Sequence, residues 1–553
     1  MRKPNIKNNS SIDVKATESS SINNTNTKDS LTINNSKRTR IRGKREQPTH
    51  KHNIKGPAQR VALANPKTKG GKPSAEQVSL LFAKNNGLEL GENLLNPKLK
   101  FKRTAERKDL TQLFTFTIDS DHSMDLDDAI SIKLLPNGAM KLFIHISDVA
   151  ESIPLNSEVD LQARARGTSI YLPGLVLPMF NFTLSHDSLS LLPGKNRFAL
   201  TLESDIDAEG KVIRSNIYQS RVKSNIRLDY SQISNIVTGF DALPEGMPLK
   251  YKSTVVKSIQ ALHLLSQRIG QQRIIRGGVN FEQFFTSATV NPVNELIGHE
   301  IIERVMVLAN EQAALWLEER NSPAVYRAHP SFLPQDIKSL SKLAEQNGVL
   351  LHLPDVITPV VFAALLAQIK DHEAEQTLLR YIQKIINKAF YTYERSSHFG
   401  LGSSGYLHFT SPIRRYSDLV NHRLIKSILK EGHNEVSDTS VLVERENITV
   451  DNGLLESLNN LSLEAVKYEK EANNSLLLSE IDVPSKVFAA LFIYESKNCS
   501  YFRTDFSKVL ARVTPKNSIN FTKKYGKLRR GSSYNFTLVE LDYVNNIFDL
   551  DFA

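Results

Sequence analysis

Five carboxylate side chains fall within ten residues, between two apolar segments of the chain. The stretch reads Thr117-Ile118-Asp119-Ser120-Asp121-His122-Ser123-Met124-Asp125-Leu126-Asp127-Asp128-Ala129. Apolar residues predict one strand over Leu113–Asp119 and another over Ala129–Leu135. Each pair of like charges about 4 Å apart repels by roughly 1 kcal/mol even in bulk water. A fold that crowds these aspartates at a strand end therefore needs a positive partner among them.

A divalent cation is the natural partner, and a site made of carboxylate oxygens favours Mg²⁺ or Mn²⁺ over zinc. Two other interpretations compete with it. A solvated acidic turn explains most acidic clusters, but apolar strands on both sides argue against a free loop. A calcium loop of the EF-hand type requires Gly at its sixth position and Glu at its twelfth. Counted from Asp119, these positions hold Met124 and Ile130, so the calcium loop is excluded.

The positive charge is concentrated in the first 75 residues. Residues 1–75 hold 17 Lys and Arg against four acidic residues, which gives +13, whereas the whole chain carries +11. The segment is polar and has no aromatic residue, so we expect it to be disordered. A basic tail beside a nearly neutral body predicts contact with a polyanion. A merely solubilising extension is the alternative.

Local patterns divide the chain into four segments: the basic tail 1–75, a lead-in 76–107, a central domain 108–484 and a C-terminal domain 485–553. Ala75–Lys84 predicts a helix, and Asn137-Gly138 predicts a hairpin that leads into a strand over Lys141–Val149. Helical periodicity dominates residues 254–430, including Ile301–Leu317 and Thr358–Phe390, and a polar loop follows over 431–451. The fold class is therefore α+β.

The last 70 residues predict a small all-β unit of about five strands, compatible with an OB-type barrel that binds single strands. Strands are expected over Val487–Tyr494, Lys508–Val513 and Tyr534–Tyr543, with turns at Lys497-Asn498 and Asn545-Asn546.

Composition excludes several classes of protein. No apolar run approaches the roughly 18–20 residues that span a bilayer, and the polar N-terminus is not a secretory signal. The single cysteine, Cys499, excludes an internal disulfide and any multi-cysteine metal site. We expect a cytoplasmic monomer with no membrane contact.

The acidic stretch resembles the signature of the RNB catalytic domain, found in the ribonuclease II/ribonuclease R family. In that signature T-I-D is followed six residues on by D-x-D-D-A, and Asp119, Asp125, Asp127 and Asp128 match this spacing, with Asp121 extra. Five further segments resemble the family in the same order: Ile170–Gly174, Val325–His329, Asp355–Thr358 with Phe362 beyond it, Tyr393–Gly402 and Thr410–Asp418. The resemblance covers residues 108–480.

The resemblance implies a 3′-to-5′ exoribonuclease that hydrolyses single-stranded RNA to nucleoside 5′-monophosphates with bound divalent metal. It implies that Asp119, Asp125 and Asp128 hold the metals, while Asp127 fixes the 3′-terminal nucleotide. Glu394 would sit at the terminal ribose or position water.

The resemblance also implies an RNA-binding set. Tyr326 and Phe362 would form a stacking clamp, and Tyr171 would stack farther up the channel. Arg414 and Arg415 precede an amphipathic helix expected over Ser417–Lys430, and they are either an exposed basic pair or phosphate contacts.

Two departures from the family pattern stand out. Members usually carry two cold-shock-type barrels ahead of the catalytic domain, whereas here only the basic tail and the lead-in precede it. A late helix of the family carries an arginine near the scissile phosphate, and the matching position holds Lys470, which would stabilise the developing phosphorane without a bidentate fork.

These departures keep a second hypothesis open, a catalytically impaired RNA-binding protein on an RNB scaffold. A metal phosphoesterase acting on small nucleotides is a third.

Overall fold

The computed structural model describes residues 72–99, 107–239, 243, 247–279, 295–431, 448–481, 487–496, 499–514, 526–543 and 546–553. Residues 71–553 form one compact unit. The tail up to residue 71, the loop over 432–447, the turn Lys497-Asn498 and Asn545 lie outside the described residues. In the described part of the chain, no helix is both long and apolar enough to cross a membrane.

A seven-stranded sheet carries the acidic stretch. Its strands are β1 (Lys108–Asp109), β2 (Phe116–Asp119), β3 (Asp128–Leu134), β4 (Met140–Ser147), β7 (Asn196–Ile206), β8 (Val212–Lys223) and β9 (Ile226–Asp229). Their spatial order is β1-β8-β7-β4-β3-β2-β9, with parallel pairs β1–β8 and β2–β9 at the two edges. The expected hairpin joins β3 to β4, and Gly138 takes the positive φ of 78° that its turn requires.

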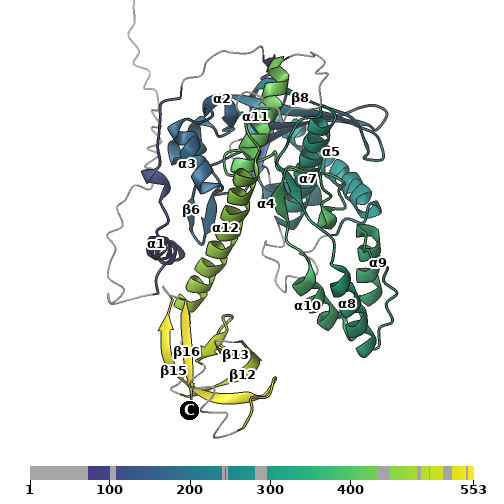
Figure 1. Cartoon of the computed structure of the whole chain (residues 1–553). Helices are drawn as coiled ribbons and strands as arrows, with labels where there is room; N and C mark the ends of the chain where they lie inside the picture. Colours follow the sequence, from purple (N-terminus) through teal and green to yellow (C-terminus); the bar gives the residue numbers. More distant parts are fainter. Residues whose placement is uncertain are drawn as a thin grey trace, which may run out of the picture. The chain divides into compact units, whose positions relative to one another are not determined.

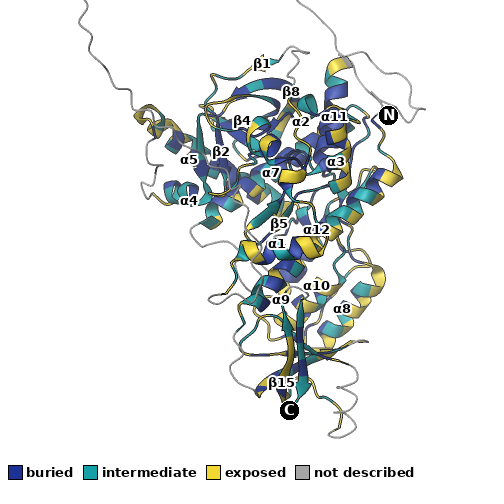
Figure 2. Ribbon diagram, turned by 90° about the vertical axis from the view of Figure 1, so that its left-hand side faces the viewer, coloured by how far each residue is buried: buried dark blue, intermediate teal, exposed yellow. Residues whose placement is uncertain are grey.

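One row of apolar side chains crosses five strands and builds the main core. Phe116, Ile130, Ile144, Leu202 and Ile217 are paired strand to strand and nearly fully buried. The same core contains residues of α5 (Leu249–Ile275) and α7 (Leu296–Glu318), and α4 (Tyr230–Thr238) packs on both helices. Figure 2 shows these strands and the inner faces of the helices as mostly buried. The helix expected over Ile301–Leu317 is confirmed as α7.

Helix α11 (Tyr416–Glu431) confirms the helix expected over Ser417–Lys430, but most of its polar residues are not solvated. An amphipathic helix was expected over Ser417–Lys430, but every residue from Tyr416 to Ser427 is buried. Its polar residues are buried in specific contacts. Arg423 donates to Asp160 at 2.6 Å, and Lys426 donates to Asp148 at 2.8 Å. Burying a polar side chain costs little free energy when the fold replaces its hydrogen bonds to water. These polar residues of α11 are therefore buried, although their spacing along the sequence is typical of a helix with one solvated face.

A second core lies in a helical lobe. It is built by α8 (Pro334–Gln346), α9 (Pro359–Ile369) and α10 (Glu375–Ile385), which lie side by side in Figure 1. The helical stretch expected over Thr358–Phe390 is therefore two helices, and its last residue begins β11 (Phe390–Thr392). β11 pairs with β10 (Tyr326–Ala328) in a separate two-stranded sheet.

Helix α12 (Asn452–Ser479) runs beside two short elements, the β5–β6 hairpin (Ile170–Leu172 and Leu175–Leu177) and α1 (Ala75–Asn85). Figure 1 shows α1 next to β6 and α12. α1 confirms the helix expected over Ala75–Lys84. It begins with a capping box in which Ser74 and Gln77 satisfy each other's backbone N–H groups.

The C-terminal residues form a closed barrel with the order β12-β13-β14-β16-β15. In chain order its strands are β12 (Phe488–Glu495), β13 (Ser500–Arg503), β14 (Ala511–Val513), β15 (Ser533–Asp542) and β16 (Ile547–Phe552). Phe502, Phe536 and Phe548 fill its interior. The predicted α+β class and the five-stranded OB-like barrel are confirmed.

Candidate active site

The acidic stretch is the loop between β2 and β3, at one end of the large sheet. Asp119 is the last residue of β2, and Asp128 is the first residue of β3. Leu126 is fully buried between them, its N–H donates to Ser190 Oγ at 3.1 Å, and its carbonyl accepts from Leu191 N at 3.0 Å. The buried leucine pins the loop, so the aspartates on either side of it are held rather than free in solvent.

Asp127 reaches across to the start of α11. Its Oδ1 accepts a hydrogen bond from the backbone N–H of Ile413 at 2.7 Å, and its Oδ2 lies 3.6 Å from Arg414 Nε. Arg415 points elsewhere, because it makes two hydrogen bonds of 2.8 Å with the buried carboxylate of Asp418. Of the two arginines predicted to contact RNA, the structure therefore brings only Arg414 to the acidic loop.

Tyr171 approaches the loop from β5. Its hydroxyl donates to Asp125 Oδ2 at 3.2 Å, while the residue as a whole is 39% exposed. Its backbone N–H donates to Glu469 Oε1 on α12 at 3.0 Å. The structure thus places an exposed aromatic ring directly beside the carboxylates.

A second wall comes from β9 and α4, whose residues no sequence motif assigned to the site. Arg227 Nη2 donates to the carbonyl oxygens of Ser120 and Asp121 at 2.6 and 2.9 Å. Asp229, the last residue of β9, is paired with Asp119 in the parallel β2–β9 register. Tyr230 follows it, and the ring of Tyr230 stacks on His299 with centroids 3.7 Å apart. β9 has only four residues, too short for a strand pattern to stand out in the sequence.

The carboxylates are held in an environment that disfavours their charge. Burial, followed by repulsion from Asp128 and Asp125, raises the pKa of Asp119. Burial also raises the pKa of Asp127 and Asp128, and Arg414 opposes both shifts. Each of these three residues keeps one buried carboxylate oxygen, Oδ2, without a hydrogen-bond partner. Buried oxygens without donors are costly unless something positive satisfies them.

A divalent cation fits this set of donors. The unpartnered oxygens belong to hard carboxylate ligands of the kind that Mg²⁺ and Mn²⁺ prefer. Among the described residues, however, no group of three or more acidic, histidine or cysteine side chains already has the spacing that holds a metal ion. The aspartates would therefore have to close around a cation when it binds.

The remaining predicted residues lie on other elements. Tyr326 on β10 is paired with Thr392 on β11, and Glu394 follows on the exposed loop two residues later. Tyr326 is only 4% exposed and belongs to the main core, so its predicted stacking role does not agree with the structure. Lys470 is exposed on α12, one residue after Glu469, whose carboxylate accepts a hydrogen bond from Tyr171 N. The cations that lower the pKa of Asp119 are Arg227 and Arg414, and Arg414 also lowers that of Asp128.

Phe362 departs from its predicted role. It is 1% exposed in the core of the helical lobe, with ring centroids 5.3 Å from Phe332 and 5.4 Å from Phe399. A ring packed among apolar partners cannot stack on a base without leaving that core, so the stacking role does not agree with the structure.

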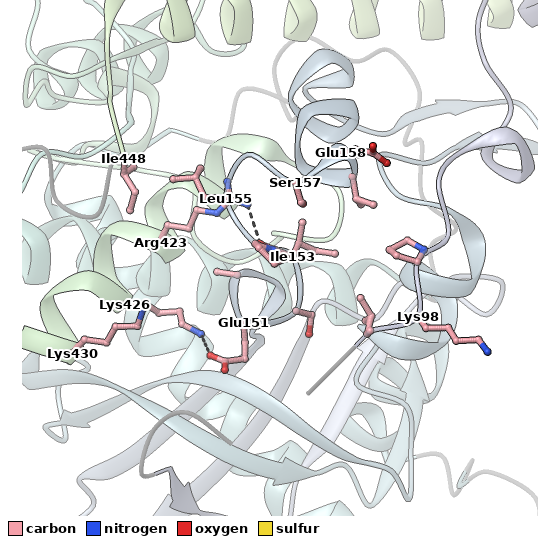
Figure 3. Close-up of a pocket in the computed structure, with 16 residues that line it drawn as sticks. Lys98, Glu151, Ile153, Leu155, Ser157, Glu158, Arg423, Lys426, Lys430 and Ile448 are labelled. Carbon is pink, nitrogen blue, oxygen red and sulfur yellow. Dashed lines mark hydrogen bonds and ion pairs between the residues drawn. The ribbon is translucent and has the colours of Figure 1, made fainter. Parts of the chain in front are cut away.

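A cavity of about 690 Å³ lies elsewhere, between α2 (Val149–Ser152), α3 (Glu158–Arg166) and α11. None of the predicted site residues lines it. Its buried cations are already paired, Lys426 with Glu151 as Figure 3 shows and Arg423 with Asp160. We therefore place the candidate active site at the acidic loop.

Comparisons with known proteins show what the chain is similar to. Residues 107–431, more than half of the chain, match a family model described as the RNB domain. Ribonuclease R of Thermotoga maritima is 33% identical over 346 residues, covering 62% of this chain and 48% of that protein. Ribonuclease R of Mycoplasma pneumoniae is 33% identical over 416 residues, covering 72% of this chain and 55% of that protein. The chain spans about half the length of these curated relatives.

Solved structures agree at the level of the fold. Mycoplasma genitalium RNase R in complex with double-stranded RNA superposes with a TM-score of 0.69 at 25% identity, covering 88% of this chain and 84% of that one. The same enzyme in complex with ribose-methylated single-stranded RNA gives a TM-score of 0.67, with coverages of 87% and 76%. Yeast Ssd1, a pseudonuclease, has the same fold at 17% identity and a TM-score of 0.58, covering 82% of this chain and 56% of that one.

Proposed function

Because this chain belongs to the RNB domain family, we propose that it is a divalent-metal-dependent exoribonuclease that shortens single-stranded RNA from the 3′ end. One observation supports this most directly. Asp119, Asp127 and Asp128, at the end of the sheet, each keep one buried carboxylate oxygen without a hydrogen-bond partner, and the guanidinium of Arg414 lies beside that of Asp127. Carboxylates and a guanidinium held this close together are stabilised when a cation binds the carboxylates and a phosphate binds the guanidinium.

Asp119, Asp125 and Asp128 are the residues that would hold the metal. When bound, divalent cations neutralise phosphate charge and make a bound water more acidic. In the hydrolysis, the water oxygen bonds to the terminal phosphorus, and the bond from that phosphorus to the 3′-oxygen of the preceding nucleotide breaks. The 3′-oxygen takes up a proton, so the products are a nucleoside 5′-monophosphate and an RNA one residue shorter.

The other residues would orient the RNA. Asp127 is fixed by Ile413 N, which leaves its Oδ2 to accept a hydrogen bond from the terminal ribose. A contact to the 2′-hydroxyl is what would distinguish RNA from DNA. Arg414 would stabilise the charge that develops on the phosphate, and Lys470 remains a second candidate for this role. The exposed ring of Tyr171 offers a stacking surface for an incoming base.

The test is a labelled-RNA assay. Purified protein with Mg²⁺ should convert 5′-labelled oligo(A) into a ladder that shortens from the 3′ end, and a chelator should stop it. Matched oligo(dA) should be shortened far more slowly. A protein that cuts the RNA internally, or that hydrolyses only mononucleotides, would contradict the proposal.

A non-catalytic RNA-binding protein is the second candidate. It is favoured by the lack of a preformed ligand group for a metal ion among the described side chains. In the same assay, this alternative predicts tight binding of oligo(A) with no shortening at any concentration of Mg²⁺ or Mn²⁺.

A further inference from the structure

We propose that helix α1 is a positioning element for the active site, which it serves by bracing the β5–β6 hairpin through Ser79 and Phe82. The inference rests on the proposed function. α1 lies ahead of the residues that match the RNB domain model, which begin at 107, so the family match assigns it no role. Its contacts nevertheless lead, residue by residue, to Asp125.

The hairpin is too small to fix its own position. β5 and β6 have three residues each, joined by Pro173-Gly174, and Gly174 has a φ of 70°. An isolated two-stranded hairpin is at best marginally stable in water, so its place depends on what packs against it.

α1 supplies one side of that packing. Ser79 Oγ donates to the carbonyl oxygen of Pro173 at 2.7 Å, so the helix holds the turn of the hairpin itself. Phe82 is 2% exposed and shares a small core with Leu172 and Leu177, one from each strand. The approach is close enough that a side chain at Gly174 would come within 3.0 Å of the backbone of α1.

α12 supplies the other side. Ala472 is fully buried in the same small core, and the ring of Tyr468 makes an edge contact with Phe82, with centroids 6.3 Å apart. The carboxylate of Glu469 accepts from Tyr171 N. The hairpin is therefore clamped between α1 and α12, which also contact each other directly.

Tyr171 carries the effect into the site. It is the middle residue of β5, and its hydroxyl donates to Asp125 Oδ2 at 3.2 Å. Groups that hydrogen-bond a metal-binding carboxylate set the orientation of that carboxylate. A hairpin freed from α1 would lose both this hydrogen bond and the fixed position of the ring.

A double-mutant cycle tests whether α1 acts through Tyr171. We expect Tyr171→Phe to lower kcat/KM on oligo(A) by roughly 10- to 100-fold, the usual effect of removing such a supporting hydrogen bond. Phe82→Ala should lower it by at least about fivefold, and adding Tyr171→Phe to it should cost no more than about twofold beyond the worse single variant. Lys84→Ala, an exposed position on the same helix, is the matched control and should change nothing. Multiplicative effects of the two substitutions would overturn the inference.

Hydrogen exchange tests the brace without reference to activity. In Phe82→Ala, amide exchange across residues 168–178 should rise at least about tenfold, while β3 and β4 stay as protected as in the parent protein. Ser79→Ala, which removes one hydrogen bond and no core volume, should show the same change more weakly. Unchanged exchange in both variants would overturn the inference even if the protein degrades RNA. Raised exchange in a protein that never shortens RNA would instead leave the brace standing and refute the proposed function.

Discussion

Asp127 is the carboxylate whose surroundings differ most from those of its neighbours. It is 4% exposed, one oxygen is held by Ile413 N, and the other faces Arg414. We predict that Asp127→Asn lowers the rate of RNA shortening by at least about 100-fold, because the replacement keeps the shape and removes the charge. Single-turnover rates on oligo(A) would measure this, and binding of the same RNA should change only slightly.

The same loop offers a matched control. Asp121 is also an aspartate beside the site, but its side chain is 81% exposed. Asp121→Asn should therefore leave the single-turnover rate within about twofold. Equal losses in the two variants would mean that general charge, rather than the fixed geometry of Asp127, governs the rate.

Arg227 is the residue that holds the turn of the acidic loop. Its guanidinium donates to two consecutive carbonyl oxygens, those of Ser120 and Asp121. We predict that Arg227→Ala lowers kcat by roughly 10-fold or more, because a loosened loop no longer directs Asp119 and Asp125 toward one point. Arg221→Ala is the control, since that arginine sits on β8 in an exposed ion pair with Asp109. A full rate in Arg227→Ala would show that Leu126 and Ser190 hold the loop unaided.

At the scale of single elements, the sequence predicted what local patterns can encode. The strands on either side of the acidic stretch, the Asn-Gly hairpin and α7 lie where apolar spacing and turn residues put them. The partners of the site could not be predicted from local patterns, because Asp127 and Ile413 are 286 residues apart in the chain. Only the resemblance to the RNB family brought Arg414 and Tyr171 into consideration, and it did not bring in Arg227 or Tyr230.

Two errors at this scale have one physical cause, which is that burial depends on tertiary contacts. The polar residues of α11 suggested a solvated face, yet Asn421, Arg423 and Lys426 are buried because each finds a specific partner. The family resemblance gave Phe362 a stacking role, yet the helical lobe encloses it. Periodicity reports which residues are polar, and it does not report whether the fold supplies partners for them.

The start of α11 gives a prediction about pH. Burial alone would raise the pKa of Asp418, but its contacts with Arg415 and Ser411 N outweigh burial and lower the pKa from 3.8 to about 2. A lowered carboxyl pKa stabilises the fold above 3.8, and that stabilisation is lost as the pH falls toward 2. The difference corresponds to about 2 kcal/mol.

Asp418→Asn should therefore destabilise the protein most near neutral pH. The gap in urea midpoint between the variant and the parent protein should shrink as the pH is lowered through the window from 3.8 to about 2. The pKa of Glu203 is also lowered, from 4.5 to about 2, and its carboxylate binds Tyr218 and Lys141 rather than any residue of the acidic loop. Glu203→Gln should therefore show the same trend between pH 4.5 and about 2, without loss of RNA shortening. A midpoint gap independent of pH would contradict the role given to Asp418.

At the scale of the whole molecule, the distribution of charge along the chain separates two kinds of proposed RNA contact. The residues that match the RNB domain carry the candidate chemistry, and the C-terminal barrel is of a type that binds single strands. The excess positive charge lies in neither, because it is concentrated in residues 1–75. The family resemblance predicted the RNB domain and local strand patterns predicted the barrel, and both are confirmed as parts of the fold, whereas the role of the basic segment rests on charge alone.

The basic segment should contribute affinity through phosphate contacts that depend on salt. Residues 1–71 contain 16 Lys and Arg against four acidic residues, a net +12, and removing them leaves Ser74 to cap α1. Each phosphate neutralised on a single strand steepens the slope of log K against log salt by about 0.7. We predict that this truncation weakens oligo(A) binding and flattens the slope by at least about 2, as for three lost contacts.

A shorter truncation separates charge from length. Residues 1–35 hold five basic and three acidic residues, a net +2, so their removal takes away half of the segment but little of its charge. It should change the salt slope by less than about 0.7, the value of one phosphate contact. Fluorescence titration of labelled oligo(A) across a range of salt concentrations measures both slopes. If the two truncations behave alike, the Lys-Arg cluster over residues 37–45 does not contact RNA, and the segment acts as a solubilising extension.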